Sequence, residues 1–141
     1  MHALSSYDYA IVRVVPCVER EEFVNAGVIL FCRTRGFLDA RIALDAERLR
    51  VLAPDLDLDE VRERLEIIPR ICRGGKEGGL IGQLSASERF HWLTSPRSTI
   101  IQTSPVHAGL CEEPRATLEH LLRKMVLPKE YVQGGSVSVA E

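Results

Sequence analysis

Apolar residues run together or alternate with polar ones in three segments near the start of the chain, a pattern typical of β-strands. The first segment, residues 7–15, is rich in β-branched and aromatic residues and stops at Pro16. Residues 28–33 and 37–44 form two more segments, and the short connection between them ends at Gly36, which can adopt a positive φ. The pattern predicts an antiparallel meander of three strands.

Later segments have the spacing or the capping residues of helices. The expected helix starts are Asp45, Asp57, Ser85 with Glu88 as a capping box, and Pro114. After Pro114, apolar residues recur three and four positions apart, which predicts one buried stripe. Proline at position 69 is expected to end or kink the second helix, because it lacks an amide proton.

The remaining segments complete a prediction of the fold class. Four glycines within residues 74–79 predict a mobile loop, and residues 99–103 predict a fourth strand between two Ser-Pro dipeptides. We therefore expect an α+β fold, an antiparallel sheet of about four strands packed against three to four helices that cover one face. Residues 1–128 are expected to form this single domain and residues 129–141 a disordered tail.

Composition and charge narrow the classes of function. The chain has 141 residues, of which 45% are apolar and 27% charged, as in an average globular domain. Its net charge of −2 makes nucleic-acid binding an unfavoured prediction, although 15 of the 18 cationic residues are arginines. We expect a cytoplasmic protein without membrane contact, because neither a signal peptide nor a long apolar run is present.

Cysteine and histidine spacing predicts neither a metal site nor a cofactor. The four cysteines are far apart and contain no C-x-x-C pair, and His107 with Cys111 is an isolated pair. The usual phosphate-loop, nucleophile-elbow and zinc-protease motifs are absent from the sequence.

Arg13 is the first candidate site residue, because it stands in an apolar strand. Alternation places it on one face with Tyr7, Tyr9 and Ile11, where a charged group is unexpected. The side chain either extends to solvent at the end of the sheet or binds an anion in a cleft. In the next segment, Arg20 and Asn25 are candidates for the same cleft, although Asn25 to Gly27 also has the composition of a turn.

Polar residues crowd around the predicted fourth strand and form the second candidate region. Arg97 and Ser98 can bind an oxyanion through a guanidinium fork and a hydroxyl, and Gln102 adds an amide. His107 is the one candidate for acid–base catalysis, because imidazole is the side chain best suited to accept and release protons under physiological conditions. The alternative is that these residues cap local turns beside an edge strand.

Two segments resemble a bacterial family, the domain of unknown function 3037. They are YDYAIVRVVPCVEREEFVNAGVIL and SPRSTIIQTSPVHAGL, followed by a helix that begins with Pro114, and the resemblance extends from Tyr7 to Pro128. It implies no catalytic residues. It implies a protein partner, a HipA-like kinase. It also implies that the family's hallmark segments include Arg20, Asn25, Gly27, Ser95, Arg97, Ser98 and His107.

Two hypotheses follow for the function. The first is a small non-catalytic binding or accessory module, with a HipA-like kinase as its partner. The alternative is a small enzyme that acts on a phosphate-bearing or nucleotide substrate through Arg97 and His107. The sequence leaves the oligomeric state open. The deciding observation is whether Arg13, Asn25, Arg97 and His107 line one pocket.

Overall fold

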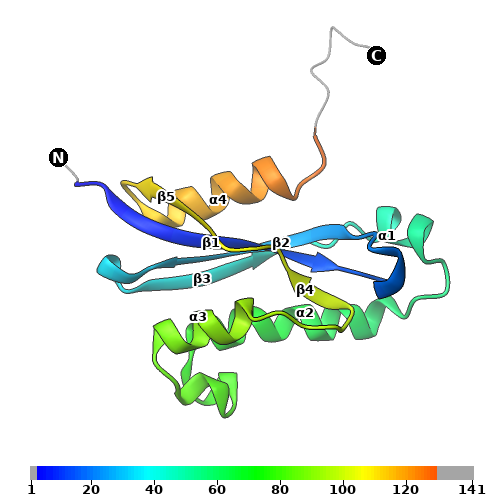
Figure 1. Cartoon of the computed structure of the whole chain (residues 1–141), viewed down its shortest axis with the longest axis horizontal. Helices are drawn as coiled ribbons and strands as arrows, with labels where there is room; N and C mark the ends of the chain where they lie inside the picture. Colours follow the sequence, from blue (N-terminus) through cyan, green and yellow to red (C-terminus); the bar gives the residue numbers. More distant parts are fainter. Residues whose placement is uncertain (1–2, 130–141) are drawn as a thin grey trace, which may run out of the picture.

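A five-stranded antiparallel sheet forms the middle of the computed structural model, which describes residues 3–129 (Figure 1). The strands are β1 (Ser5–Val14), β2 (Val24–Cys32), β3 (Phe37–Ile42), β4 (Ile101–Thr103) and β5 (His107–Cys111). Their order is β3-β2-β1-β4, and β5 also pairs with β1. The central strand β1 therefore brings the N-terminal meander together with a segment about 90 residues later in the sequence. The predicted α+β class and antiparallel sheet are confirmed.

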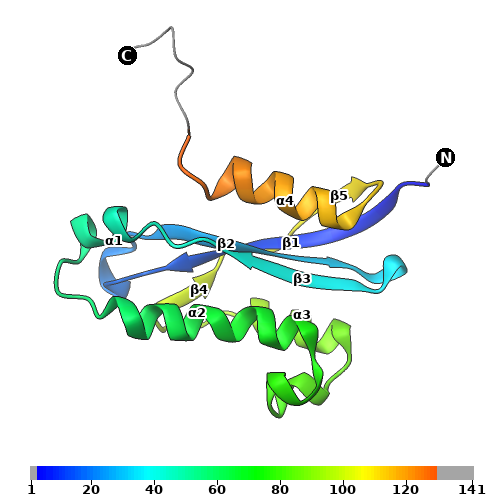
Figure 2. The same ribbon diagram turned by 180° about the vertical axis from the view of Figure 1, so that it is seen from behind.

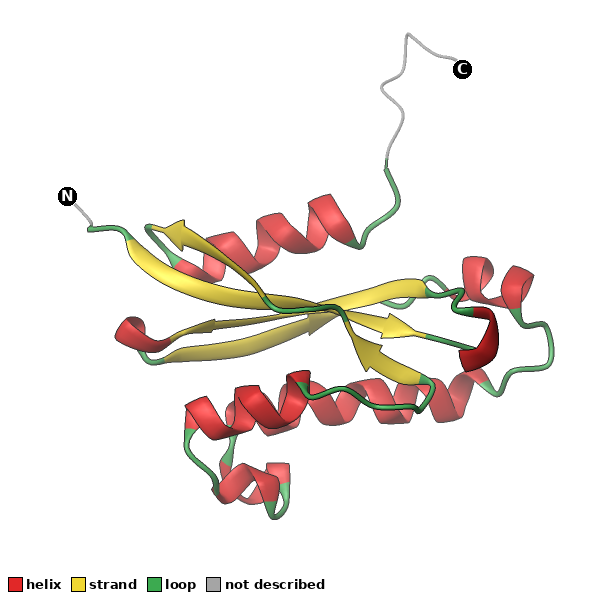
Figure 3. Ribbon diagram, viewed as in Figure 1, coloured by secondary structure: helices red, strands yellow, loops and turns green. Residues whose placement is uncertain are grey.

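The helices begin where the sequence predicts (Figure 3). They are α1 (Ala46–Leu52), α2 (Leu58–Arg73), α3 (Ala86–Thr94) and α4 (Pro114–Met125), with short 3-10 helices η1 (Val18–Arg20), η2 (Arg33–Arg35), η3 (Gly75–Gly78) and η4 (Ile81–Gln83). The side chains of Asp45 and Asp57 accept hydrogen bonds from amides in the first turns of α1 and α2. Ser85 and Glu88 form the complete capping box of α3.

Helices cover both faces of the sheet, so the prediction of one covered face was wrong. α2 and α3 lie on one face and α4 on the other (Figures 1 and 2). In β2, Ile29 and Phe31 pack in the core on the α2 side, whereas Val28 and Leu30 pack in the core on the α4 side. An apolar run without alternation is the pattern of a strand buried on both faces, and β2 has that pattern.

The edge of the sheet beside β1 consists of two short strands separated by residues 104–106. The Ser104 amide donates to the Ile11 carbonyl at 2.8 Å, and the Ile11 amide donates to the Ser104 hydroxyl at 2.8 Å. The chain then leaves and rejoins β1 as β5, a strand that the sequence did not predict. Its Gly109 lies under the Tyr7 ring, where an added Cβ would be 2.6 Å from the hydroxyl. The small residues of β5, Ala108 and Gly109, suit this close packing but have low strand propensity. The sequence of β5 therefore lacks the pattern of a typical strand.

Three local predictions also need correction. β2 begins at Val24, so Asn25 and Gly27 belong to a strand and not to a turn. Helix α2 continues through Pro69 to Arg73, because buried residues on both sides of the proline hold it against the sheet. The glycine segment contains the 3-10 helix η3, and the backbone of Gly75 approaches closely to Gly82 in η4, where an added Cβ would clash with the Gly75 carbonyl. The glycines here permit close packing and positive φ angles.

Two further predictions concern the C-terminal tail and contact with membranes. Most of the predicted tail, from residue 130 onward, lies outside the described residues. Across residues 3–129 no helix has the length and apolar character needed to cross a membrane.

Candidate functional site

Arg13 lies near the end of β1 on the α4 face and has no charged partner. Its guanidinium carbon is 4.1 Å from the centre of the Phe23 ring, a cation–π distance. The Nε atom is buried and has no hydrogen-bond acceptor in the described part of the chain. None of the ion pairs within residues 3–129 includes Arg13. Its charge is therefore available to a ligand.

A bulge in the sheet determines the surroundings of Arg13. The pairing of β1 with β2 shifts between Val12 and Arg13, so that Arg13 lies opposite Asn25. The Asn25 amide group donates to the Met125 carbonyl at 3.1 Å, while its Oδ1 atom is buried and unpartnered among the described residues. A buried donor and a buried acceptor thus remain unsatisfied on paired residues, which is uncommon in folded proteins.

Arg13 lines an open cleft together with three of the other predicted residues. We call this hollow of about 460 Å³ the arginine cleft. It is lined by Arg13, Val15, Val18, Glu19, Glu21, Phe23, Arg97, Ser98 and Gln102. The two arginines come from β1 and from the segment after α3, so the sheet brings together residues that are distant in sequence.

Arg97 has a structural role in addition to its place in the cleft. Its Nη1 atom donates to the carbonyls of Leu93 and Ser95 at 3.1 and 3.2 Å, and Nη2 donates to that of Trp92 at 2.6 Å. These contacts satisfy carbonyls at the end of α3, where a positive charge is favourable. Burial lowers the pKa of the Arg97 guanidinium, although arginine stays protonated in proteins.

The other predicted site residues do not line the arginine cleft. His107 is exposed on β5, with its ring centre 5.3 Å from that of Tyr9. Arg20 is exposed on η1 and donates from Nε to the Glu22 carboxylate at 2.7 Å. Asn25 is paired with Arg13 in the sheet but does not face the cleft. The four residues of the deciding test therefore do not share one pocket.

Comparison with known families agrees with the resemblance seen in the sequence. The family described as Protein of unknown function (DUF3037) matches residues 9–126. The chain belongs to this family. Neither a curated protein nor a solved structure matches it. All the lining residues of the arginine cleft lie within the matched part of the DUF3037 domain.

A second hollow of the DUF3037 domain was not predicted. We call it the apolar groove; its volume is about 180 Å³. It is lined by Arg64, Ile67, Ile68, Ile71, Trp92, Leu93, Arg97, Thr99, Ile101, Gln102 and Thr103. Ile67 lies beside the buried stripe of α2 and is 46% exposed, and Trp92 is 39% exposed. In the sequence, the one indication of the apolar groove was Ile67, an apolar residue next to the buried stripe of α2.

The cysteines of the DUF3037 domain offer little nucleophilic chemistry. Cys32, Cys72 and Cys111 are buried, and Cys17 is exposed. Burial raises the pKa of the Cys72 thiol to about 12, so this side chain stays protonated at neutral pH. Within residues 3–129 no group of three His, Cys, Asp or Glu side chains is arranged to hold a metal ion.

Proposed function

We propose that the DUF3037 domain is a non-catalytic binding or accessory module that holds an acidic group of its ligand in the arginine cleft. The observation that carries this proposal is Arg13, half-buried on Phe23 and without a carboxylate partner. A charged group removed from water is unfavourable unless it is paired. A carboxylate or phosphate of the ligand would supply the missing acceptor, and two oxygens can accept from one guanidinium.

The alternative is a small enzyme that acts on a phosphate-bearing or nucleotide substrate through Arg97 and His107. It requires both residues at one substrate, yet Arg97 lines the arginine cleft and His107 does not. Arg97 also donates three hydrogen bonds to backbone carbonyls at the end of α3. A general acid or base must reach the reacting atoms. These observations favour binding over catalysis.

We test the cleft with inorganic phosphate as the probe, followed by NMR of the arginine Nε–H groups and the backbone amides. The Arg13 Nε and Ser98 amide signals should shift in a saturable way. Arg13→Gln should abolish this saturation, whereas Arg62→Gln should not. Arg62 is a matched control because it is an exposed arginine on α2 that lines neither hollow. Shifts at Arg13 no larger than those at Arg62 would overturn the proposal.

The proposed protein partner is a HipA-like kinase, and its support is the family resemblance alone. Co-expression of the domain with a HipA-like kinase from the same genome provides the test. A complex of fixed stoichiometry that is lost in Arg13→Gln and kept in Arg62→Gln is the expected result. Separate elution of the two proteins during size-exclusion chromatography would reject this partner.

A further inference from the structure

The outer edge of β4 has unpaired backbone groups. The Val15 amide donates to the Ile100 carbonyl, and the Ser104 amide donates to the Ile11 carbonyl. Hydrogen-bonded and non-bonded pairs alternate in an antiparallel ladder, so Gln102, opposite Arg13, also bonds to β1. The amides and carbonyls of Ile101 and Thr103 therefore point away from β1. Within residues 3–129 only one of these four groups has a partner, the Ile101 carbonyl, which accepts from the Thr99 hydroxyl at 3.0 Å.

The same edge separates the two hollows. Ile101 and Thr103 lie opposite Val14 and Val12, which face α2, and both line the apolar groove. Gln102 lies opposite Arg13 and lines the arginine cleft as well as the groove. A strand added beside β4 would place alternate side chains on the two faces of the sheet. Those opposite Ile101 and Thr103 would enter the groove, and the one between them would reach the cleft.

We propose that β4 is a strand-addition site for an extended segment of a partner protein with the pattern apolar, acidic, apolar. The acidic position rests on the proposed function, because it is the group that Arg13 would bind. The apolar positions rest on a separate observation, the exposed Ile67 and Trp92 beside the edge. Addition of a strand to a free sheet edge is an established mode of peptide recognition, with affinity from the backbone and specificity from alternate side chains.

Charge favours an acidic partner over a second copy of this chain at the same edge. β4 itself reads Ile101-Gln102-Thr103 and contributes no carboxylate. If two β4 edges paired, the residue of the second strand that lies between the two apolar-facing positions would be Gln102, so that strand would bring no carboxylate to Arg13. A peptide carboxylate at that position would give Arg13 an ion-pair partner, which Glu19 and Glu21 in the same cleft do not provide within residues 3–129.

Trp92 makes the proposal directly measurable, because it is the one tryptophan in the chain and it lines the apolar groove. The probe is the blocked peptide acetyl-Ser-Leu-Glu-Leu-Ser-amide, titrated while tryptophan fluorescence is recorded. We expect a saturable change. A peptide with the phase reversed, acetyl-Ser-Glu-Leu-Glu-Ser-amide, should bind at least about tenfold more weakly, because its acids would face the groove. Methylation of the leucine and glutamate amides of the first peptide should have a similar effect.

Two matched variants test the edge itself. Thr103→Pro removes an amide that points away from β1, so the ladder with β1 stays intact, and proline is tolerated on edge strands. It should weaken binding at least about tenfold, whereas Thr103→Val, which keeps the amide, should not. Circular dichroism and an unchanged melting temperature establish that each variant is folded. If Thr103→Pro unfolds the domain, the amide-methylated peptide provides the same test on the intact chain.

The outcomes separate this inference from the proposed function. Loss of binding in both Thr103→Pro and Arg13→Gln supports both. If Thr103→Pro and the methylated peptide bind normally while Arg13→Gln does not, strand addition is overturned and the arginine cleft stands. If Arg13→Gln binds normally while Thr103→Pro does not, the edge site stands without its acidic position and the proposed function fails. Dimerisation of the free protein that Thr103→Pro abolishes would assign the edge to a second copy and overturn the proposal.

Discussion

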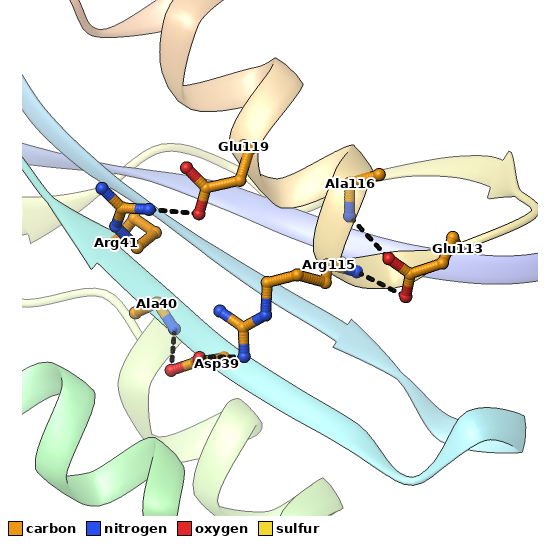
Figure 4. Close-up of polar contacts among 7 residues, drawn as sticks. All are labelled: Asp39, Ala40, Arg41, Glu113, Arg115, Ala116 and Glu119. Carbon is orange, nitrogen blue, oxygen red and sulfur yellow. Dashed lines mark hydrogen bonds and ion pairs between the residues drawn. The ribbon is translucent and has the colours of Figure 1, made fainter.

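Two arginines stack on phenylalanines on the α4 face of the sheet, and only one of them has a carboxylate partner. The guanidinium carbon of Arg115 on α4 lies 4.9 Å from the centre of the Phe37 ring. Arg115 also pairs with Asp39 at 2.6 Å (Figure 4). Arg13 on β1 lies 4.1 Å from the Phe23 ring and pairs with no carboxylate in the described residues. The aromatic contact is common to both, so the difference between the two sites is the carboxylate.

The paired site has the arrangement expected of a structural contact. Asp39 accepts a hydrogen bond from the Ala40 amide with one oxygen and forms an ion pair with Arg115 through the other (Figure 4). Arg41 beside it donates a hydrogen bond to Glu119 on α4. These contacts join β3 to α4 and satisfy each charge within the fold. At the unpaired site, no ion pair joins Arg13 to another element within residues 3–129. Arginine on the same face of the same sheet can thus fix a helix or remain open to a ligand, and the neighbouring carboxylate decides which.

The largest effect on stability is expected at the paired site. Asp39→Ala should lower the free energy of unfolding by about 1 to 2 kcal/mol, because it removes a carboxylate, 21% exposed, that accepts one hydrogen bond and forms one ion pair. In a double-mutant cycle with Arg115→Ala, the coupling should be about 0.5 to 1 kcal/mol. Urea unfolding measures both. A coupling of zero would mean that packing alone holds α4 against the sheet. The carboxylate would then not account for the difference between Arg115 and Arg13.

Arg13→Met should change stability much less than Asp39→Ala. The substitution removes a partly buried charge without a partner and keeps an apolar contact with Phe23. The lost cation–π contact is worth about 0.5 to 1 kcal/mol, and relief of the unpaired Nε offsets it. We expect the free energy of unfolding to stay within about 0.5 kcal/mol of the wild type. A loss of about 2 kcal/mol or more would show that Arg13 is structural.

The sequence predicted the elements more fully than their arrangement. Helix starts follow from local contacts, such as the capping box of Ser85 and Glu88, and these could be read directly. The second covered face could have been predicted from the unbroken apolar run in β2. β5 could not, because its pairing with β1 joins residues about 100 positions apart and Gly109 is selected by its fit under Tyr7. The strand propensities of individual residues carry no information about such a long-range contact.

The candidate site was predicted in its chemistry but not in its geometry. Arg13 could be identified from the sequence alone, because it is a charged residue among apolar neighbours in a predicted strand. The convergence of Arg13 with Arg97 depends on the pairing of β1 with β4, and the separation of His107 depends on the break at Ser104. Neither follows from spacing along the chain. The apolar groove likewise exists only where α2, α3 and β4 meet.

The smallest predicted effect concerns the pH dependence of stability at a third arginine, Arg20, which, like Arg115, has a carboxylate partner. The hydrogen bond and charge of Arg20 lower the pKa of the Glu22 carboxyl. A carboxyl whose pKa is lower in the folded state stabilises the fold above its unfolded pKa, and that contribution is lost as pH falls through the folded pKa. Both side chains are exposed to solvent, so the effect on unfolding should be slight. In carbon-detected NMR titrations, Arg20→Gln should raise the Glu22 pKa towards its ordinary value, whereas Arg13→Gln should leave it unchanged. A shift of the Glu22 pKa in Arg13→Gln would mean that the charge of Arg13 is already compensated within the fold.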